Sequence, residues 1–401
     1  MKLSRELGLF QVTIAGVGII LGAGIYALLG IAAGSAGNAT WLAFLISAIV
    51  ALFTGLSYAE LSSVFKGDAG EYDYLKSTLK KKFAFSVALS VIAAGVISAA
   101  TVALGFAGYV TEIISMPLVV AAVLLIALMT LINFAGIKET SWFNTISTCI
   151  EFGGLALIIF LGWEYLGTVN YMEMPHGYKG VFSAGALVFF AFMGFESIVK
   201  LREETKDPEY VIPRALVLAV IITSIVYVLV AMAAVSVIGW EELARSSAPL
   251  AVVATVAFGG YAFIILGIIA LFSTSNTVLI TMVATSRMMY GMAKERSLPK
   301  ILAAVHRRTR TPWVSVLLVT LFTVAFTLIG DIEFVANLTN VFLFITFASV
   351  NLSLIILRMK CKKNTAKFKC PINIGRFPVI ALLGMVSSLV MLGFVIINLM
   401  G

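Results

Sequence analysis

The sequence predicts an all-α integral membrane protein, and its composition and the recurrence of its apolar segments support that prediction. Of its 401 residues, 61% are hydrophobic and 12% are charged, and its mean hydropathy is +1.05. Soluble domains contain about 45–50% apolar and about 25% charged residues. Apolar runs of about 20 residues, long enough to cross a bilayer as a helix, recur along the whole chain. We therefore expect a single transmembrane domain over residues 1–401.

Taken in order, the apolar runs predict about eleven transmembrane helices. Their expected ranges are 8–33, 40–65, 84–115, 117–136, 141–167, 181–201, 213–239, 260–292, 313–330, 334–357 and 376–399. The segment 250–292 is long enough for two crossings, but the charge pattern favours one. Residues 247–259, interrupted by Pro249 and by Gly259 and Gly260, are then expected to form an extracellular helix or a re-entrant segment.

The positions of the charged residues predict the orientation of these helices. All 28 Lys and Arg residues except Lys179 and Arg245 lie at the N-terminus or in loops on one side. Because cytoplasmic loops of membrane proteins are enriched in Lys and Arg, we expect a cytoplasmic N-terminus and an extracellular C-terminus. The net charge of +8 then reflects topology and attraction to the anionic inner leaflet of the cell membrane, and it indicates no nucleic-acid partner.

Glycines interrupt two of the predicted helices at mid-membrane. Gly16, Gly18, Gly22 and Gly24 cluster in the first, and Gly194 lies among aromatic residues in the sixth. Non-helical backbone at this depth is tolerated only where protein or a water-filled cavity surrounds it. Because the two interrupted helices are five apart, they indicate two inverted repeats of five helices, with one discontinuous helix in each.

The expected repeats cover about 8–167 and 181–357, and an additional helix follows at about 376–399. A helix break exposes carbonyl groups at the end of its first half and N–H groups at the start of its second half. Together these ends can bind a zwitterion when glycine lets a carboxylate approach the backbone. The alternative interpretation is that the small residues only allow close helix packing, which we expect for Gly16 and Gly30.

Four segments carry a resemblance to a known family. They are GIILGAGIYALLG, LSYAELSSVFKGDAGEYDYLK, FFAFMGFESIVKLREETKDPEYVIPRAL and LFSTSNTVLITMVATSRMMYGMAKERSLPKILAAVHRRTRTP. With these segments in order over nearly its full length, the chain resembles the amino acid–polyamine–organocation (APC) transporter superfamily. The resemblance implies the five-plus-five inverted-repeat transporter fold with discontinuous helices 1 and 6. It also implies alternating access and a central site between helices 1, 3, 6, 8 and 10, although family members commonly have one helix more than this chain.

Carried over by position, the resemblance implies a substrate site at the two breaks. The N–H groups of Ala23 and Gly24, with access provided by Gly22, would bind the substrate carboxylate, and Phe192 would cover the site as an aromatic gate. The substrate amine would meet four carbonyl groups, those of Ile20, Phe190, Ala191 and Met193. A side-chain pocket is expected on helix 3, by location rather than by motif, at Gly105, Phe106 and Tyr109.

Glu151 lies near the centre of the fifth predicted helix, where an ionisable residue is a functional candidate. In related transporters a lysine at the similar position stands in for a sodium ion, so a glutamate implies different chemistry. Three roles are open: proton coupling, binding of a cation such as sodium beside Ser273 or Ser275, or binding of the distal amine of a cationic substrate. A neutral glutamic acid with a purely structural hydrogen bond is the fourth interpretation. We favour proton coupling, since protonation lets the residue change state without carrying net charge.

Other polar residues have structural interpretations. Glu60, near the inner end of the second helix, is expected to make a hydrogen bond or an ion pair with the cytoplasmic loops. Cys149, Cys361 and Cys370 have no histidine nearby in the sequence, so we expect free thiols rather than a metal site. No cofactor is expected.

These observations predict a secondary active transporter that takes up amino acids across the cell membrane together with protons. An enzyme is not expected, because the sequence contains no Ser-His or Cys-His constellation, HExxH pair or buried Asp pair. The alternatives are an exchanger of amino acids or polyamines, a transporter of cationic substrates, and a nutrient sensor that binds without transport. A measurement of flux separates the last of these from the others.

Overall fold

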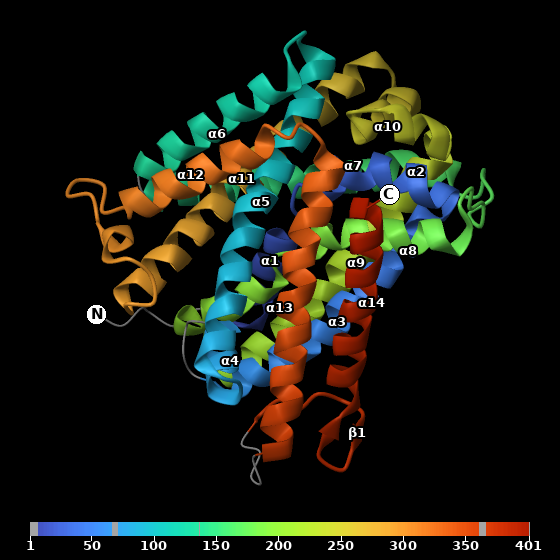
Figure 1. Ribbon diagram of the computed structural model, residues 1–401. Helices are drawn as coiled ribbons and strands as arrows, with labels where there is room; N and C mark the ends of the chain where they lie inside the picture. Colours follow the sequence, from blue (N-terminus) through green and yellow to red (C-terminus); the bar gives the residue numbers. More distant parts are fainter. Residues whose placement is uncertain (1–6, 66–70, 136, 361–365, 401) are drawn as a thin grey trace.

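The computed structural model describes residues 7–65, 71–135, 137–360 and 366–400, and nearly all of these residues are helical (Figure 1). The α-helices are α1 (Leu9–Ile20), α2 (Gly24–Ala36), α3 (Thr40–Val64), α4 (Glu71–Thr78), α5 (Lys81–Ile113), α6 (Leu118–Ala135), α7 (Ile137–Gly162), α8 (Gly177–Val188), α9 (Pro208–Arg245), α10 (Pro249–Phe258), α11 (Gly260–Lys294), α12 (Trp313–Thr327), α13 (Ile332–Lys360) and α14 (Val379–Met400). The 3₁₀ helices are η1 (Gly37–Ala39), η2 (Trp163–Tyr165), η3 (Phe189–Phe192), η4 (Phe195–Glu204) and η5 (Lys300–Ala303). Two short antiparallel strands, β1 (Asn373–Ile374) and β2 (Phe377–Pro378), form a hairpin before α14.

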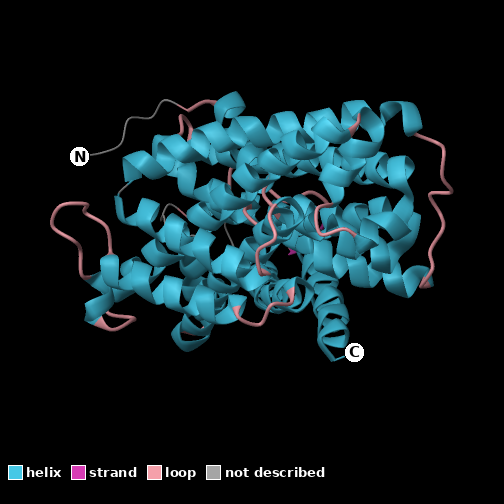
Figure 2. Ribbon diagram, turned by 90° about the horizontal axis from the view of Figure 1, so that it is seen from above, coloured by secondary structure: helices cyan, strands magenta, loops and turns pink. Residues whose placement is uncertain are grey.

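Long apolar helices dominate the described part of the chain. Nine stretches of it are long and apolar enough to cross a membrane, and α1, α10 and α12 are shorter apolar helices. This architecture confirms a multi-pass membrane protein and is consistent with an APC-type transporter fold. Viewed from above, helices make up the bulk of the molecule and loops join them (Figure 2). The segment 247–259 contains α10, a separate helix of 10 residues before Gly259, whose φ is +99°.

The first discontinuous helix is present where the glycines predict it. α1 ends at Ile20, Leu21 leaves helical geometry with a ψ of 72°, and α2 begins at Gly24. Leu21 still donates its N–H to the Val17 carbonyl, so the first half of the helix finishes with a regular turn. The chain therefore crosses this region as two helices joined by three non-helical residues, 21–23.

The second discontinuous helix consists of α8 with η3, followed by η4. Gly194 separates the two halves with a φ of +117°, which glycine adopts without the strain that a Cβ imposes. A Cβ at this position would also lie 2.9 Å from the Ile19 carbonyl oxygen. The break thus needs glycine for its backbone conformation and for its close approach to α1.

The two breaks lie against each other in antiparallel order. Gly194 lies beside Ile19, whereas a Cβ on Gly24 would lie only 2.5 Å from the Cα of Ala191. As the chain advances from residue 19 to 24 in one break, the contacts in the other therefore run from 194 back to 191. This arrangement is what two discontinuous helices of opposite direction produce.

Two apolar cores flank the breaks. One core contains buried residues of α1, α3, α8 and α9, and the other contains buried residues of α5, α6, α11 and α12. Ile20 and Ala191 belong to the first core, whereas Ala23 and Phe190 belong to the second. The breaks consequently lie at the seam between two packed bodies, where backbone groups remain available to a cavity.

Candidate transport site

A cavity of about 320 Å³ lies at this seam, at the lower end of the size range of about 300–1,000 Å³ for small-molecule sites. Its walls come from the two breaks, from the inward faces of α5 and α7, and from one face of α11 between Asn276 and Met288. Seven of the predicted substrate residues line it: Ile20, Gly22, Ala23, Gly24, Phe190, Ala191 and Met193. The sequence motifs of the two halves therefore meet in one cavity.

The start of α2 presents N–H groups beside this cavity, whose lining includes Gly24 but not Ile25 or Tyr26. The first three N–H groups of α2, on Gly24, Ile25 and Tyr26, have no acceptor within the helix, because the Ala23 carbonyl bonds to the Ala27 N–H. The Ala23 N–H donates to the Thr277 hydroxyl at 3.2 Å. With the positive end of the helix dipole, these groups favour an anion.

The two central glycines of the motif have different surroundings. A Cβ on Gly24 would collide with the backbone of Ala191, so this glycine allows the two breaks to pack together. A Cβ on Gly22 would lie 3.3 Å from the Thr277 hydroxyl oxygen and would meet no backbone closer than 3.7 Å. The sequence leaves close helix packing and access for the substrate as alternative reasons for these glycines. Close packing accounts for Gly24, whereas Gly22 faces the Thr277 side chain.

Tyr227 of α9 connects the carbonyl ends of both breaks. Its hydroxyl lies 2.7 Å from the Ile20 carbonyl oxygen and 3.0 Å from the Ala191 carbonyl oxygen. The Ile20 carbonyl also accepts the Gly22 N–H at 2.6 Å, and the Phe190 carbonyl accepts the Met193 N–H at 3.1 Å. An ammonium group reaching the Ile20 or Ala191 carbonyl therefore has to share or displace the tyrosine hydroxyl.

Phe192 lies outside the lining of this cavity. So do the residues predicted on the third transmembrane helix, which is α5 in the structure. Phe192 is fully buried and packs edge-on against Tyr227, with ring centroids 5.3 Å apart. Tyr109 donates its hydroxyl to the Tyr26 carbonyl at 3.2 Å, and Gly105 packs against Ala27. Phe106, of the same segment, is half-buried beside the second core. The α5 residues that line the cavity are Val91, Gly95 and Ser98.

Glu151 reaches the cavity from α7. It is 1% exposed, and its Oε1 accepts a hydrogen bond of 2.6 Å from the Ser273 hydroxyl on α11. The backbone carbonyl of Glu151 accepts the Tyr26 hydroxyl at 3.2 Å. Ser275 is also buried on α11, but it does not line the cavity. Glu151 thus lines the cavity, and Ser273, one of the two serines considered from the sequence, bonds to it from outside the lining.

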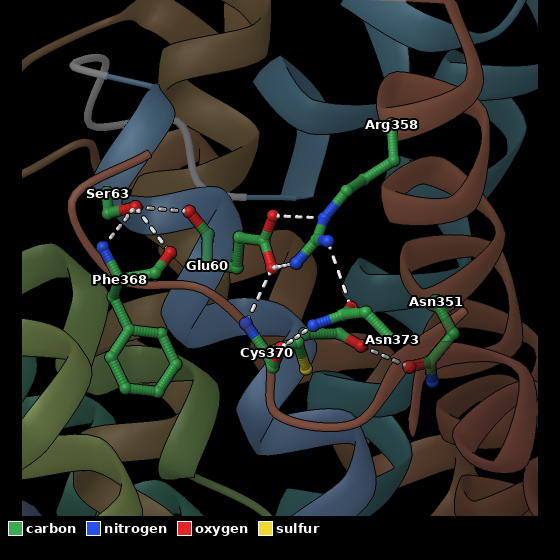
Figure 3. A network of polar contacts seen from close by, with 8 residues as sticks. Glu60, Ser63, Asn351, Arg358, Phe368, Cys370 and Asn373 are labelled. Carbon is green, nitrogen blue, oxygen red and sulfur yellow. Dashed lines mark hydrogen bonds and ion pairs between the residues drawn. The ribbon is translucent and has the colours of Figure 1, made fainter. Parts of the chain in front are cut away.

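A second buried carboxylate lies away from the cavity (Figure 3). Glu60 of α3 accepts two hydrogen bonds from Arg358 of α13, at 2.7 and 2.6 Å, and a third from the Cys370 N–H at 2.8 Å. Arg358 also donates to the Asn373 Oδ1 at 2.9 Å, and Asn373 donates to the Cys370 carbonyl. Glu60 makes an ion pair, as predicted, but its cationic partner Arg358 lies on α13 rather than in a loop. Residues of the 366–378 segment complete the network.

Several functional candidates were missed by reasoning from the sequence. Tyr227, Thr277 and Asn276 all bond to residues more than 100 positions away or line the cavity from another helix. The available signal was polarity: Tyr227 interrupts an aliphatic run, and STSNT at 273–277 is a polar cluster inside an apolar helix. Of the cysteines, Cys149 and Cys370 are free thiols, and Cys361 lies outside the described residues, as do Lys2, Arg5 and Gly401.

Comparison with known proteins agrees with this architecture. A family model described as amino acid permease matches residues 7–401. The chain is 28% identical over 418 residues to the branched-chain amino acid permease BcaP of Bacillus subtilis, covering 99% of this chain and 90% of that protein. It is 30% identical to the inner membrane transport protein YbaT of Escherichia coli, covering 84% and 80%, and 26% identical to the cationic amino acid transporter 4 of Mus musculus, covering 90% and 60%. The chain therefore belongs to the amino acid permease family of membrane transporters.

Proposed function

We propose that this protein is a secondary active transporter that takes up an amino acid by alternating access and couples that uptake to protons through Glu151. The observation that supports the proposal is that one cavity is lined both by the two helix breaks and by the buried carboxyl group of Glu151. One site can then bind substrate and proton together.

The two breaks suit the common part of an amino acid. The N-terminal end of α2, at Gly24, favours the substrate carboxylate, and the carbonyl groups of Phe190 and Ala191 lie at the other break, where the amine is accepted. Much of the remaining lining is apolar, including Ile19, Val91, Ile280 and Met288. This lining favours a substrate with an apolar side chain, as the name of the branched-chain permease relative also suggests.

The surroundings of the Glu151 carboxyl group support proton coupling. An ionised carboxylate in a low-dielectric interior is costly unless a cation compensates it. No Lys, Arg or His is among the described residues that line the cavity. A proton on Glu151 removes that cost, so loading and release of the proton can accompany closing and opening of the cavity to each side.

A cationic substrate is the second candidate. Glu151 and Glu196 both line the cavity, and a distal ammonium group would compensate a carboxylate there as a proton does. The named substrate class of the mouse relative, cationic amino acids, is in line with this alternative. Transport of lysine in preference to leucine would favour it.

Glu151→Gln tests the coupling. Glutamine keeps the size and the hydrogen bond to Ser273 but cannot ionise, so exchange of bound substrate should continue while accumulation driven by a pH gradient is lost. At one proton per substrate, a gradient of one pH unit drives about tenfold accumulation in the wild type. The measurement is uptake of labelled amino acids into proteoliposomes with imposed pH gradients.

Glu164→Gln is the matched control, because Glu164 is an exposed carboxylate in η2 that contacts no part of the cavity. It should accumulate substrate as the wild type does. If the Glu151→Gln protein still concentrates substrate in response to a proton gradient, Glu151 is not the coupling residue.

A further inference from the structure

The first half of the second discontinuous helix ends in a change of hydrogen-bond pattern. α8 is α-helical up to Val188, and the chain continues as the 3₁₀ helix η3. In an α-helix a carbonyl accepts the N–H group four residues ahead, whereas in a 3₁₀ helix it accepts the N–H group three residues ahead. The Met193 N–H, for example, bonds to the Phe190 carbonyl at 3.1 Å. The change of pattern leaves the last carbonyl groups of α8 without their α-helical partners.

Asn340 of α13 bonds to two of these carbonyl groups. Its Nδ2 donates to the Ala186 carbonyl at 2.8 Å and to the Leu187 carbonyl at 2.9 Å. The two acceptors fix the orientation of the amide, because the reverse orientation would place Oδ1 against both carbonyl oxygens. Asn340 has no exposed surface, so these two bonds form away from solvent.

The carbonyl group of the preceding residue also accepts a side-chain hydrogen bond. The Ser47 hydroxyl of α3 donates to the Gly185 carbonyl at 2.6 Å. That carbonyl keeps its α-helical partner, the Phe189 N–H. Ser47 therefore adds a bond to a carbonyl that is already paired, whereas the amide of Asn340 replaces α-helical partners that are missing.

The missing partners belong to the substrate site. If α8 continued as an α-helix, the two carbonyl groups that Asn340 contacts would accept the N–H groups of Phe190 and Ala191. Both residues line the cavity, and in the proposed function their carbonyl groups accept the substrate amine. The residue at which α8 ends therefore determines where these two carbonyl groups lie.

The amide of Asn340 is not explained by packing. Its Oδ1 is buried and has no hydrogen-bond partner among the residues that the structure describes. An unpaired buried acceptor is destabilising, and an apolar side chain of similar size would avoid it. The two bonds to α8 therefore account for an amide at this position.

We propose that Asn340 is a positioning residue for substrate binding: its amide ends α8 at Val188 and thereby places the carbonyl groups of Phe190 and Ala191 for the substrate amine. Asn340 is not part of the cavity lining and acts through these two residues. The inference rests on the proposed function and deepens it. Without the amide, the carbonyl groups of α8 recover the N–H groups of Phe190 and Ala191, because buried backbone groups pair where they can. η3 then turns relative to the cavity.

Asn340→Leu removes the donor with little change in side-chain volume. It should raise the KM for uptake of labelled leucine into proteoliposomes roughly tenfold, with a smaller effect on the maximal rate. Asn340→Ala, which introduces no new contact with α8, should raise the KM in the same way.

Asn351→Leu is the matched control. Asn351 is also fully buried on α13, and its amide bonds to Thr54 and Ser57 of α3, neither of which lines the cavity. Loss of these buried bonds should lower the thermal midpoint and leave the KM for leucine unchanged. The comparison separates a positioning role from a purely structural one.

Amide hydrogen exchange of the ligand-free proteins reports on the break without any substrate. In Asn340→Leu the segment 189–193 should exchange more slowly than in the wild type, because the N–H groups of Phe190 and Ala191 enter α-helical bonds. The same segment should exchange at the wild-type rate in Asn351→Leu.

A wild-type KM in both Asn340 variants would overturn the proposal. Unchanged exchange of the segment 189–193, or equal effects in Asn351→Leu, would also overturn it. Failure of the proposed function has a different signature. If the wild type takes up no leucine, the proposed function fails for this substrate, while the exchange measurement still decides whether Asn340 sets the end of α8.

Discussion

The hydroxyl of Tyr227 carries a single hydrogen but has two carbonyl acceptors within 3.0 Å, at Ile20 and Ala191. Those acceptors lie in the last turns of the first halves of both discontinuous helices. A movement of either half changes the distance to this hydroxyl, and the hydrogen can then settle on the other carbonyl. The hydrogen bond of Tyr227 therefore depends on the relative position of the two breaks.

Tyr227→Phe should impair transport more than stability. Loss of one buried hydrogen bond costs about 0.5–1.5 kcal/mol, while the carbonyl ends of both breaks lose their common donor. We expect a higher KM and a lower maximal rate in proteoliposomes, with a small change in thermal midpoint. Tyr178→Phe, at a position 67% exposed, should change neither quantity. Unaltered transport by a folded Tyr227→Phe protein would contradict this role.

The sequence located the glycines of the two breaks because glycine acts on its own backbone. Gly22, Gly24 and Gly194 could be identified without any knowledge of neighbours. Tyr227 and Thr277 could not, since their partners Ile20 and Ala23 lie 207 and 254 residues away along the chain. For Gly24 even the local signal was incomplete, because the sequence does not reveal that Ala191 packs on it.

At the scale of helices and strands, the 366–378 segment joins three helices. It contacts α3 through Ser63 and Glu60, and α13 through Arg358 (Figure 3). It contacts α9 through the Lys367–Glu209 ion pair of 2.8 Å. The Glu60–Arg358 pair is buried, with exposures of 0% and 7%, whereas the Lys367 side chain is 67% exposed. The buried pair therefore holds α3 and α13 together, and the exposed pair adds little because solvent screens it.

Arg358→Ala should destabilise the protein strongly. Removal of one member of a buried ion pair costs about 3–5 kcal/mol, because the remaining charge stays desolvated. Thermal unfolding in detergent measures the effect, and Lys367→Ala, which breaks only the exposed pair, should leave the midpoint close to that of the wild type. Equal midpoints for both variants would show that the buried pair does not contribute as the geometry indicates.

The helix boundaries illustrate what apolar periodicity can determine. The expected range 260–292 agrees closely with α11, and α10 lies in the segment 247–259, which is expected to form an extracellular helix or a re-entrant segment. The expected range 181–201 overlaps α8, η3 and η4, but nothing in the apolar pattern indicates that η4 is a 3₁₀ helix. Hydropathy records how apolar a segment is, and the choice between helix types depends on contacts such as those of Gly194 with Ile19.

At the scale of the whole molecule, the two ends differ in composition. Lys179 and Arg245 lie near one end, where Gly180 packs on Ser35 and Gly30 packs on Leu243. At the other end, Leu7 pairs with Thr205, and Lys367 reaches Glu209. The separation of these two ends follows the Lys and Arg pattern from which a cytoplasmic N-terminus is predicted. The orientation of the protein in the membrane stays a prediction.

Thiol labelling tests that orientation. In a protein with Cys149 and Cys361 replaced by serine, a cysteine at the exposed position 179 should react with an impermeant maleimide from outside the cell. A cysteine at the exposed position 307 should react only after the membrane is opened. Cys370 can remain, because burial and the neighbouring Glu60 raise the pKa of its thiol to about 12 and keep it protonated. The reverse labelling pattern would show that the orientation is opposite to the predicted one.

The hairpin before α14 also affects how the protein can be shortened. A chain that ends after α13 would retain both discontinuous helices and the cavity. It would also contain both of the expected five-helix repeats. It would nevertheless lack the Cys370 N–H and the Asn373 amide that solvate the Glu60–Arg358 pair. The segment before α14 thus contributes to the packing of α3 against α13, and affinity tags or fluorescent fusions belong after α14 and not in its place.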